Sequence, residues 1–185
     1  MTDELLFTPP GAQLIEDFVN TNELDETDGE KLLAPDDLRA WLSERELLPA
    51  GATVGDDDLA RAWRVREALR ALLLANNGEK LDKGAVATLN VAADESRLRV
   101  SFAPGGDTAE LVPDKPDVPG ALSRILAVVY TAMADESWHR LKACRLDDCQ
   151  WAFYDQSKNR SRTWCSMKVC GNRAKARAYR ERQRA

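Results

Sequence analysis

The 185-residue sequence lacks the features of several large protein classes. No apolar run reaches the roughly 18 residues that a membrane-spanning helix needs, since the best candidate, residues 125–133, is half that length. The N-terminus has neither the basic start nor the apolar centre of a secretory signal, so we expect a cytoplasmic protein with no membrane partner. The single histidine, His139, cannot complete a Ser-His-Asp triad, and no P-loop or dinucleotide fingerprint occurs, so we expect no enzymatic activity.

Positive charge is scarce in the first three quarters of the chain and concentrated at its end. From Trp138 onward, thirteen Lys and Arg residues accompany four Asp and Glu residues, which gives a net charge of +9. The preceding residues therefore carry −14 of the overall −5. This asymmetry indicates nucleic acid, or an acidic protein surface, as the partner of the basic part.

Apolar periodicity predicts a mainly helical N-terminal domain over residues 1–136. Residues 97–102 alternate in polarity and can pair with residues 109–112, so we expect one small β-hairpin. The predicted fold class is therefore mainly α with a small β-hairpin (α+β). We place the domain boundary at residues 135–137 and expect a separate core on each side of it. Apolar residues at helical spacing predict helices near residues 11–21, 35–45, 56–76, 81–93 and 120–134.

Cysteine occurs four times, always in the last quarter of the chain. Two Cys-x4-Cys pairs separated by 15 residues suit a closed tetrahedral site for one structural zinc ion. Buried free cysteines and disulfides are the alternatives, and His139 could replace a ligand, although four thiolates already suffice. The surrounding segment has few large apolar residues, so we expect bound metal to fold it. The predicted zinc ligands are Cys144, Cys149, Cys165 and Cys170.

The cysteine-containing segment, residues 144–173, resembles the CGNR zinc finger, a family named for the tetrapeptide found here at residues 170–173. The likeness includes both cysteine pairs and the Ser-x-Asn-x-Ser-Arg sequence at residues 157–162. In that family the finger typically follows a helical domain called ABATE, described as a stress-induced transcription regulator, and residues 17–21 and 66–72 look like that domain. The resemblance implies zinc, DNA binding and a treble-clef or ribbon-like finger over residues 138–185 that ends in a basic helix.

The basic C-terminus is predicted to bind nucleic acid. Arginines 173, 177, 180 and 184 share one helical face, and a second basic cluster lies between the cysteine pairs at residues 158–162. Arginine can contact phosphate or guanine, and asparagine can contact adenine. DNA is the expected partner, with RNA, an acidic protein surface and a merely solvated tail as alternatives. The predicted contacts are Lys158, Asn159, Arg160, Arg162, Asn172, Arg173, Lys175, Arg177, Arg180 and Arg184.

The N-terminal domain is expected to have a sensory or dimerisation role, with a homodimer and a small-molecule effector as open partners. Asn20, Thr21, Asn22, Trp41 and Trp63 could line a ligand pocket, although helix capping and core packing explain them more simply. The sequence therefore predicts a zinc-containing, DNA-binding transcription regulator.

Overall fold

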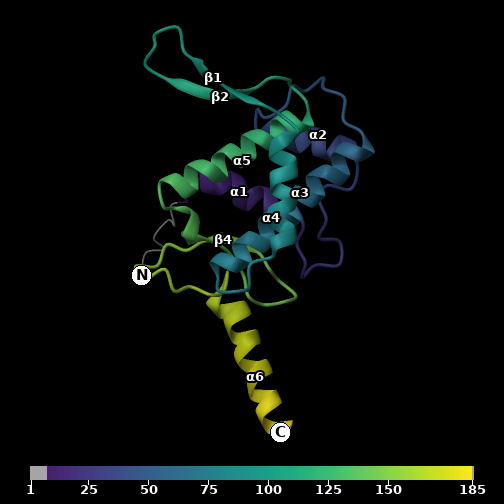
Figure 1. The fold of residues 1–185 in the computed structure, drawn as a ribbon. Coiled ribbons are helices and arrows are strands. Elements are labelled where there is room, and N and C mark those ends of the chain that lie inside the picture. Colours follow the sequence, from purple (N-terminus) through teal and green to yellow (C-terminus); the bar gives the residue numbers. More distant parts are fainter. Residues whose placement is uncertain (1–7, 185) are drawn as a thin grey trace.

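The computed structural model describes residues 8–184, about 51% of the chain being helical. Figure 1 shows a helical body from which the hairpin β1–β2 and the helix α6 project at opposite ends. No helix in this part of the chain is long and apolar enough to cross a membrane. The elements of the body are α1 (Pro10–Val19), α2 (Pro35–Glu44), α3 (Asp56–Asn76), α4 (Lys83–Asp94), β1 (Leu98–Phe102), β2 (Ala109–Pro113) and α5 (Val118–Ala134).

Acidic residues mark the start of four of these helices. Asp37 and Asp58 accept hydrogen bonds from the backbone N–H groups that precede α2 and α3, and Asp82 and Asp117 cap α4 and α5. A carboxylate at a helix N-terminus pairs an otherwise unsatisfied donor and interacts favourably with the helix dipole. Part of the negative charge of this region is therefore used in helix capping.

The helix α1 lies inside the body, where it packs against α3 and α5. Its Ile15 and Phe18 are fully buried, and the Phe18 ring lies 5.3 Å from the ring of Trp41 on α2. The long α3 has a buried apolar stripe that includes Leu69 and Leu73. The predicted helices and hairpin are all present, and the mainly α fold class is confirmed.

The C-terminal finger begins with a short 3-10 helix, Trp138–Arg140, followed by the antiparallel strands β3 (Leu141–Ala143) and β4 (Ala152–Tyr154). A π-helical turn over Met167–Gly171 then leads directly into the basic helix α6, Asn172–Arg184. A hairpin followed by a helix is the arrangement expected of a treble-clef-like finger.

The expectation of two separate cores is wrong. Leu141, Ala143 and Ala152 of the finger are fully buried in the same apolar cluster as Phe18 and Leu73 of the helical body. The strand β3 packs on α3, and β4 packs on α1. A two-stranded hairpin cannot bury an apolar face by itself, so it needs an outside partner. Only a small second cluster, formed around the cysteines, belongs to the finger alone.

Candidate metal centre and nucleic-acid interface

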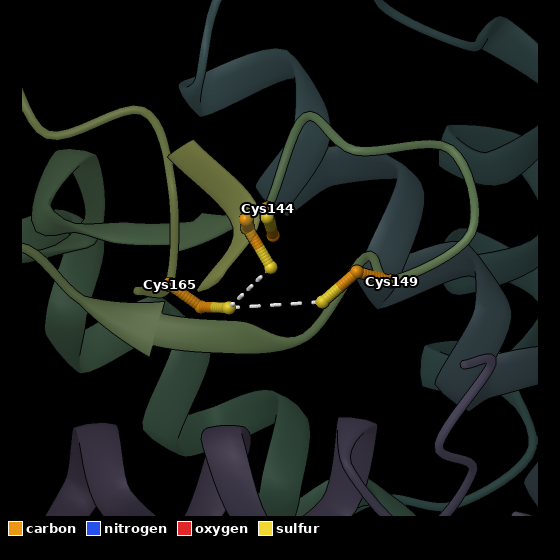
Figure 2. A group of neighbouring side chains, drawn as sticks. Cys144, Cys149 and Cys165 are labelled. Carbon is orange, nitrogen blue, oxygen red and sulfur yellow. Dashed lines mark hydrogen bonds between the residues drawn. The ribbon is translucent and has the colours of Figure 1, made fainter. Parts of the chain in front are cut away.

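The four cysteine sulfurs meet at one point of the finger. All four Sγ atoms lie within 4.8 Å of one another, with 3.6 Å between Cys149 and Cys165 and 3.5 Å between Cys165 and Cys170. Figure 2 shows the three labelled side chains, Cys144, Cys149 and Cys165, turned toward one another. A tetrahedral zinc ion with bonds of about 2.3 Å to sulfur requires sulfurs about 3.8 Å apart. The site can therefore bind one zinc ion.

Disulfides do not account for this cluster. The sulfur–sulfur distances from Cys165 to Cys170 and to Cys149, 3.5 and 3.6 Å, are far longer than a disulfide bond of about 2.05 Å. All four cysteines are free, and Cys144, Cys149 and Cys170 are buried. His139 is exposed on the 3-10 helix, outside this group of four sulfurs.

The first cysteine pair is positioned by the β3–β4 hairpin. Cys144 directly follows β3 and donates its backbone N–H to the Trp151 carbonyl at 3.0 Å. Cys149 donates its backbone N–H to the Leu146 carbonyl at 2.8 Å, which closes a tight turn. Gln150 then adopts a positive φ of 47° that directs the chain back into β4. The four residues between the cysteines thus form a rigid loop that presents both sulfurs on one side.

The second pair is positioned by the turn that starts α6. Cys165 precedes the π-helical turn, and Cys170 lies within it. A Cβ atom on Gly171 would lie 2.4 Å from the Met167 sulfur and 3.2 Å from a Trp164 ring carbon, so a larger residue would displace Met167. Asn172 donates its side-chain amide to the Lys168 carbonyl at 2.9 Å. The Gly-Asn sequence after Cys170 therefore maintains the turn that holds the last ligand.

The crowded thiols favour a bound cation. Hydrogen bonds from Cys149 and Cys165 lower the pKa of the Cys144 thiol to about 2. The hydrogen bond to Cys144, together with Cys149 and burial, raises the pKa of Cys165. One thiolate forms readily, but more thiolates beside it repel one another unless a cation neutralises them. Zn²⁺ supplies that positive charge, and metal binding is then coupled to the release of protons.

A buried ion pair shapes the basic loop between the cysteine pairs. Lys142 is 4% exposed, and its Nζ donates to Asp155 Oδ2 at 2.7 Å and to the backbone carbonyls of Arg160 and Arg162. Asp155 also accepts bonds from the Ser157 hydroxyl and from the Arg162 backbone N–H. Although burial opposes ionisation, the hydrogen bonds from Lys142 and Ser157 hold the pKa of Asp155 below its ordinary value. The loop backbone is thus bound to the interior of the finger.

The start of α6 is held by ion pairs to Asp148, which lies in the loop between Cys144 and Cys149. Arg173 and Arg177 both donate to Asp148 Oδ2, at 2.6 and 2.7 Å. Arg173 also lies 3.6 Å from Asp25 of the helical body. Two arginines one turn apart on one carboxylate set the direction in which the helix leaves the finger.

The ten predicted nucleic-acid contacts separate into two groups. Arg162 lies over the Phe153 ring at 4.8 Å and donates to the backbone carbonyls of Trp164 and Cys165, so its guanidinium is used inside the finger. Asn172, Arg173 and Arg177 are likewise engaged with neighbouring residues. The other six, which are all exposed and form no ion pair within residues 8–184, are Lys158, Asn159, Arg160, Lys175, Arg180 and Arg184.

Sequence reasoning missed a polar connection between the helical body and the finger. The Asn20 amide pairs with the backbone of β4, donating to the Ala152 carbonyl at 3.0 Å and accepting from the Ala152 N–H at 2.8 Å. The buried Arg70 donates to the Gln150 carbonyl at 2.9 Å, and also to the carbonyls of Val19 and Asn22. Both side chains thus recognise the finger backbone.

Two consecutive asparagines at the end of α3 extend this connection. Asn76 donates to the carbonyls of Trp138 and Leu141, and Asn77 donates to those of Ala143 and Thr163 at 2.7 and 2.8 Å. In the sequence, Asn-Asn-Gly at residues 76–78 is typical of a helix end. The only sequence signal for the contacts with the finger is that two adjacent side-chain amides lie at a helix end, where a single cap would suffice.

Two of the other residues considered for a ligand pocket, Thr21 and Trp63, have side chains engaged within the fold. Thr21 donates to the Phe18 carbonyl and accepts from Arg66, which also forms a two-point ion pair with Glu30. Trp63 donates its ring N–H to the Leu32 carbonyl at 3.1 Å. Capping and internal bonding therefore account for the polar groups of these residues.

One carboxyl group at the junction is strongly perturbed. Burial, reinforced by the charge of Asp17, raises the pKa of Glu16 to about 7, while Arg162 and a backbone hydrogen bond with Tyr154 oppose the shift. Its Oε1 is buried and has no hydrogen-bond partner among the described residues. Glu16 is therefore a titratable group between α1 and the finger.

Comparison with protein families gives two matches. Residues 12–136 match the ABATE family, described as "Putative stress-induced transcription regulator", and residues 140–183 match the CGNR zinc finger. The resemblance inferred from the sequence is thereby confirmed, as is the capacity to bind zinc. A comparison with curated proteins finds no match.

Proposed function

Since the chain belongs to the ABATE family and carries a CGNR zinc finger, we propose that it is a DNA-binding transcription regulator without enzymatic activity. Its DNA-contacting surface is formed by the free part of α6 and by the loop at residues 158–160. Zinc has a structural role in this function, because it joins the loop and the helix at a common centre.

The observation that carries the proposal is the projecting helix α6. It extends away from the body, and none of its residues is buried (Figure 1). A helix of 13 residues is about 20 Å long and, with its side chains, about 10–12 Å wide, which suits a DNA major groove about 12 Å wide. A helix with this many cations and no apolar core face gains little stability from its own protein, whereas phosphates would neutralise it.

The arginines of α6 divide into two roles. Arg173 and Arg177 are held by Asp148 and orient the helix, while Lys175, Arg180 and Arg184 are available for phosphates or base edges. The loop adds Lys158 and the positive-φ residue Arg160, whose backbone is fixed by Lys142. Binding of DNA therefore requires no rearrangement of the finger.

The direct test is binding of the full chain to random duplex DNA at several salt concentrations. If about six cations engage phosphates, the slope of log K against log salt is near −5. Arg180→Ala combined with Arg184→Ala should reduce the magnitude of the slope by about two and leave zinc content unchanged. The matched control removes two exposed charges from the body, Arg64→Ala with Lys83→Ala, and should leave the slope unchanged.

Three results would contradict the proposal that the finger binds DNA. Tighter binding to single-stranded or duplex RNA than to DNA at equal salt would assign the surface to RNA. No salt-dependent binding to either nucleic acid would favour an acidic protein partner. Binding that persists after a chelator removes the zinc would show that the tail alone, and not the finger, makes the contact.

A further inference from the structure

The helix α6 is anchored to the finger by one side only. Its Arg173 and Arg177 bind Asp148. Ala174 packs against the apolar cluster around the cysteines. These three residues of α6 are half-buried, and every other residue of Asn172–Arg184 is exposed. An α-helix has about 3.6 residues per turn, so the three residues lie on one side of α6, and the opposite side faces solvent.

The solvent-facing side of α6 carries a stripe of uncharged residues. The members of this stripe, which follow one another at helical spacing, are Asn172, Ala176, Tyr179 and Gln183. Tyr179 is 59% exposed, although an aromatic ring contributes most to stability when it is buried. The Asn172 amide is bound to the Lys168 carbonyl, so the other three members are the ones available to a partner.

Positive charge borders the stripe along both of its edges. Lys175 and Arg182 lie along one edge, and Arg180 and Arg184 lie along the other. None of these four cations forms an ion pair within residues 8–184. The acidic residue of α6, Glu181, lies on the anchored side instead. A neutral stripe between two cationic edges matches a DNA groove, in which uncharged base edges form the floor and phosphates form both rims.

We propose that the uncharged stripe of α6 reads base pairs in the major groove of duplex DNA and selects A·T pairs. This inference rests on the proposed function and adds the residues that choose the sequence. Ala176 and Gln183 are about 10 Å apart along the helix, which is the length of about three base steps of 3.4 Å. With the stripe on the floor of the groove, the cationic edges face the phosphates of the two strands.

The chemistry of the stripe determines which base pair it fits. The Gln183 amide matches adenine, because such an amide donates to N7 and accepts from the N6 amino group. The Ala176 methyl group and the Tyr179 ring are apolar surfaces of the kind that contact the methyl group of thymine. Arginine, the commonest partner of guanine, does not occur in the stripe. The stripe therefore fits A·T pairs better than G·C pairs.

Four short duplexes, each titrated with the full zinc-bound chain at the same salt concentration, test this reading. The first has alternating A·T pairs, and the others replace thymine by uracil, adenine by 7-deazaadenine, or A·T by inosine·cytosine. The inosine·cytosine duplex keeps the minor groove of A·T and has the major groove of G·C. Fluorescence anisotropy should show binding weakened about threefold by uracil and about fivefold or more by the other two replacements.

Two variants assign each loss to a residue. Gln183→Ala should become insensitive to 7-deazaadenine, and Tyr179→Ala should lose most of its sensitivity to uracil. Tyr130→Ala is the matched control, because it removes a tyrosine that is 70% exposed on α5, and it should change no ratio of affinities. Glu181→Gln should tighten binding to all four duplexes alike, since it removes a negative charge from α6 without removing a base contact.

Several results would overturn the proposal. Equal affinities for all four duplexes would do so, as would losses that Gln183→Ala and Tyr179→Ala leave unchanged. Equal affinity for the A·T and inosine·cytosine duplexes would place the contact in the minor groove. Tighter binding to a single strand of the same sequence would assign Tyr179 to base stacking. Salt-dependent binding without discrimination would leave the proposed function intact, whereas failure to bind any duplex would overturn both.

Discussion

The helical body and the finger are stabilised by different kinds of interaction. The body buries fully apolar side chains such as Ile15, Leu69 and Leu122, and four of its acidic residues cap helix ends. The finger buries a lysine, an aspartate and three cysteines, and its own apolar cluster is small. A segment with so polar an interior depends on groups outside its own sequence, namely a metal ion and the helical body.

The two regions also contribute different groups to the hydrogen bonds between them. The body supplies side-chain amides and a guanidinium, and the finger supplies mostly backbone carbonyl groups. Such bonds recognise the path of the finger backbone, largely independently of its side chains. The body therefore acts as a template for the finger, and the stabilities of the two regions should be coupled.

Zinc removal should have the largest effect. A chelator, or Cys149→Ser, should unfold the finger and lower the melting temperature of the body by more than about 10 °C, since zinc binding is worth about 10–16 kcal/mol in small fingers. The loss should extend to the body because Leu141 and Ala152 belong to its core. Circular dichroism during heating measures the effect, and re-addition of zinc is the control. A helical transition unchanged by zinc loss would mean that the regions are independent.

Replacement of the buried arginine at the junction ranks next. Arg70→Met should destabilise the chain by about 3–5 kcal/mol, because the backbone carbonyls of Val19, Asn22 and Gln150 lose their charged donor. Urea unfolding of the zinc-bound protein measures the change. Arg64→Met, an exposed position on the same helix, is the matched control and should change the free energy of unfolding by less than about 0.5 kcal/mol.

A single-atom change at the junction should have a smaller effect. Asn20→Asp keeps the acceptor for the Ala152 N–H but replaces the donor to the Ala152 carbonyl, at an expected cost of about 1–3 kcal/mol. The exposed Asn90→Asp serves as the control for added charge. Equal melting temperatures for the two variants would show that the Asn20 pairing contributes nothing.

The smallest expected effect concerns Glu16. Because the pKa of Glu16 in the folded chain, about 7, exceeds the ordinary glutamate value of 4.5, the native state binds its proton more tightly, and this contribution to stability is lost as pH rises through 7. Glu16→Gln removes the loss, so the variant should gain stability over the parent chain between about pH 5 and 8. Partial exposure limits the gain to about 1 kcal/mol. Glu26→Gln, at an exposed position, should show no such trend.

Local patterns in the sequence predicted most of the elements. The helix α3 was expected over residues 56–76 and occupies Asp56–Asn76, because its capping acids and apolar stripe are local signals. The hairpin was predicted from the alternating polarity of residues 97–102, which is also a local signal. The four zinc ligands were predicted because the two Cys-x4-Cys pairs have the regular spacing that a zinc site needs, and this spacing can be read from the sequence.

The nucleic-acid contacts could not be resolved in the same way. Helical spacing placed Arg173 and Arg177 on one face with Arg180 and Arg184, but it could not show that Asp148 binds the first two. Arg162 has the same charge as Arg160, yet one lies over Phe153 while the other is exposed. Which cations remain free depends on residues distant in sequence.

The sequence by itself determined the helices, the hairpin, the zinc ligands and the excess of positive charge at the C-terminus, since each follows from a residue pattern or spacing within one stretch of the chain. Only the tertiary structure decided that the finger shares the core of the body and that Asn20, Arg70, Asn76 and Asn77 bind its backbone. Every residue has a backbone carbonyl, so the sequence does not show which carbonyl a side-chain donor will bind. The donor can lie up to 132 positions away, and only the folded structure identifies it.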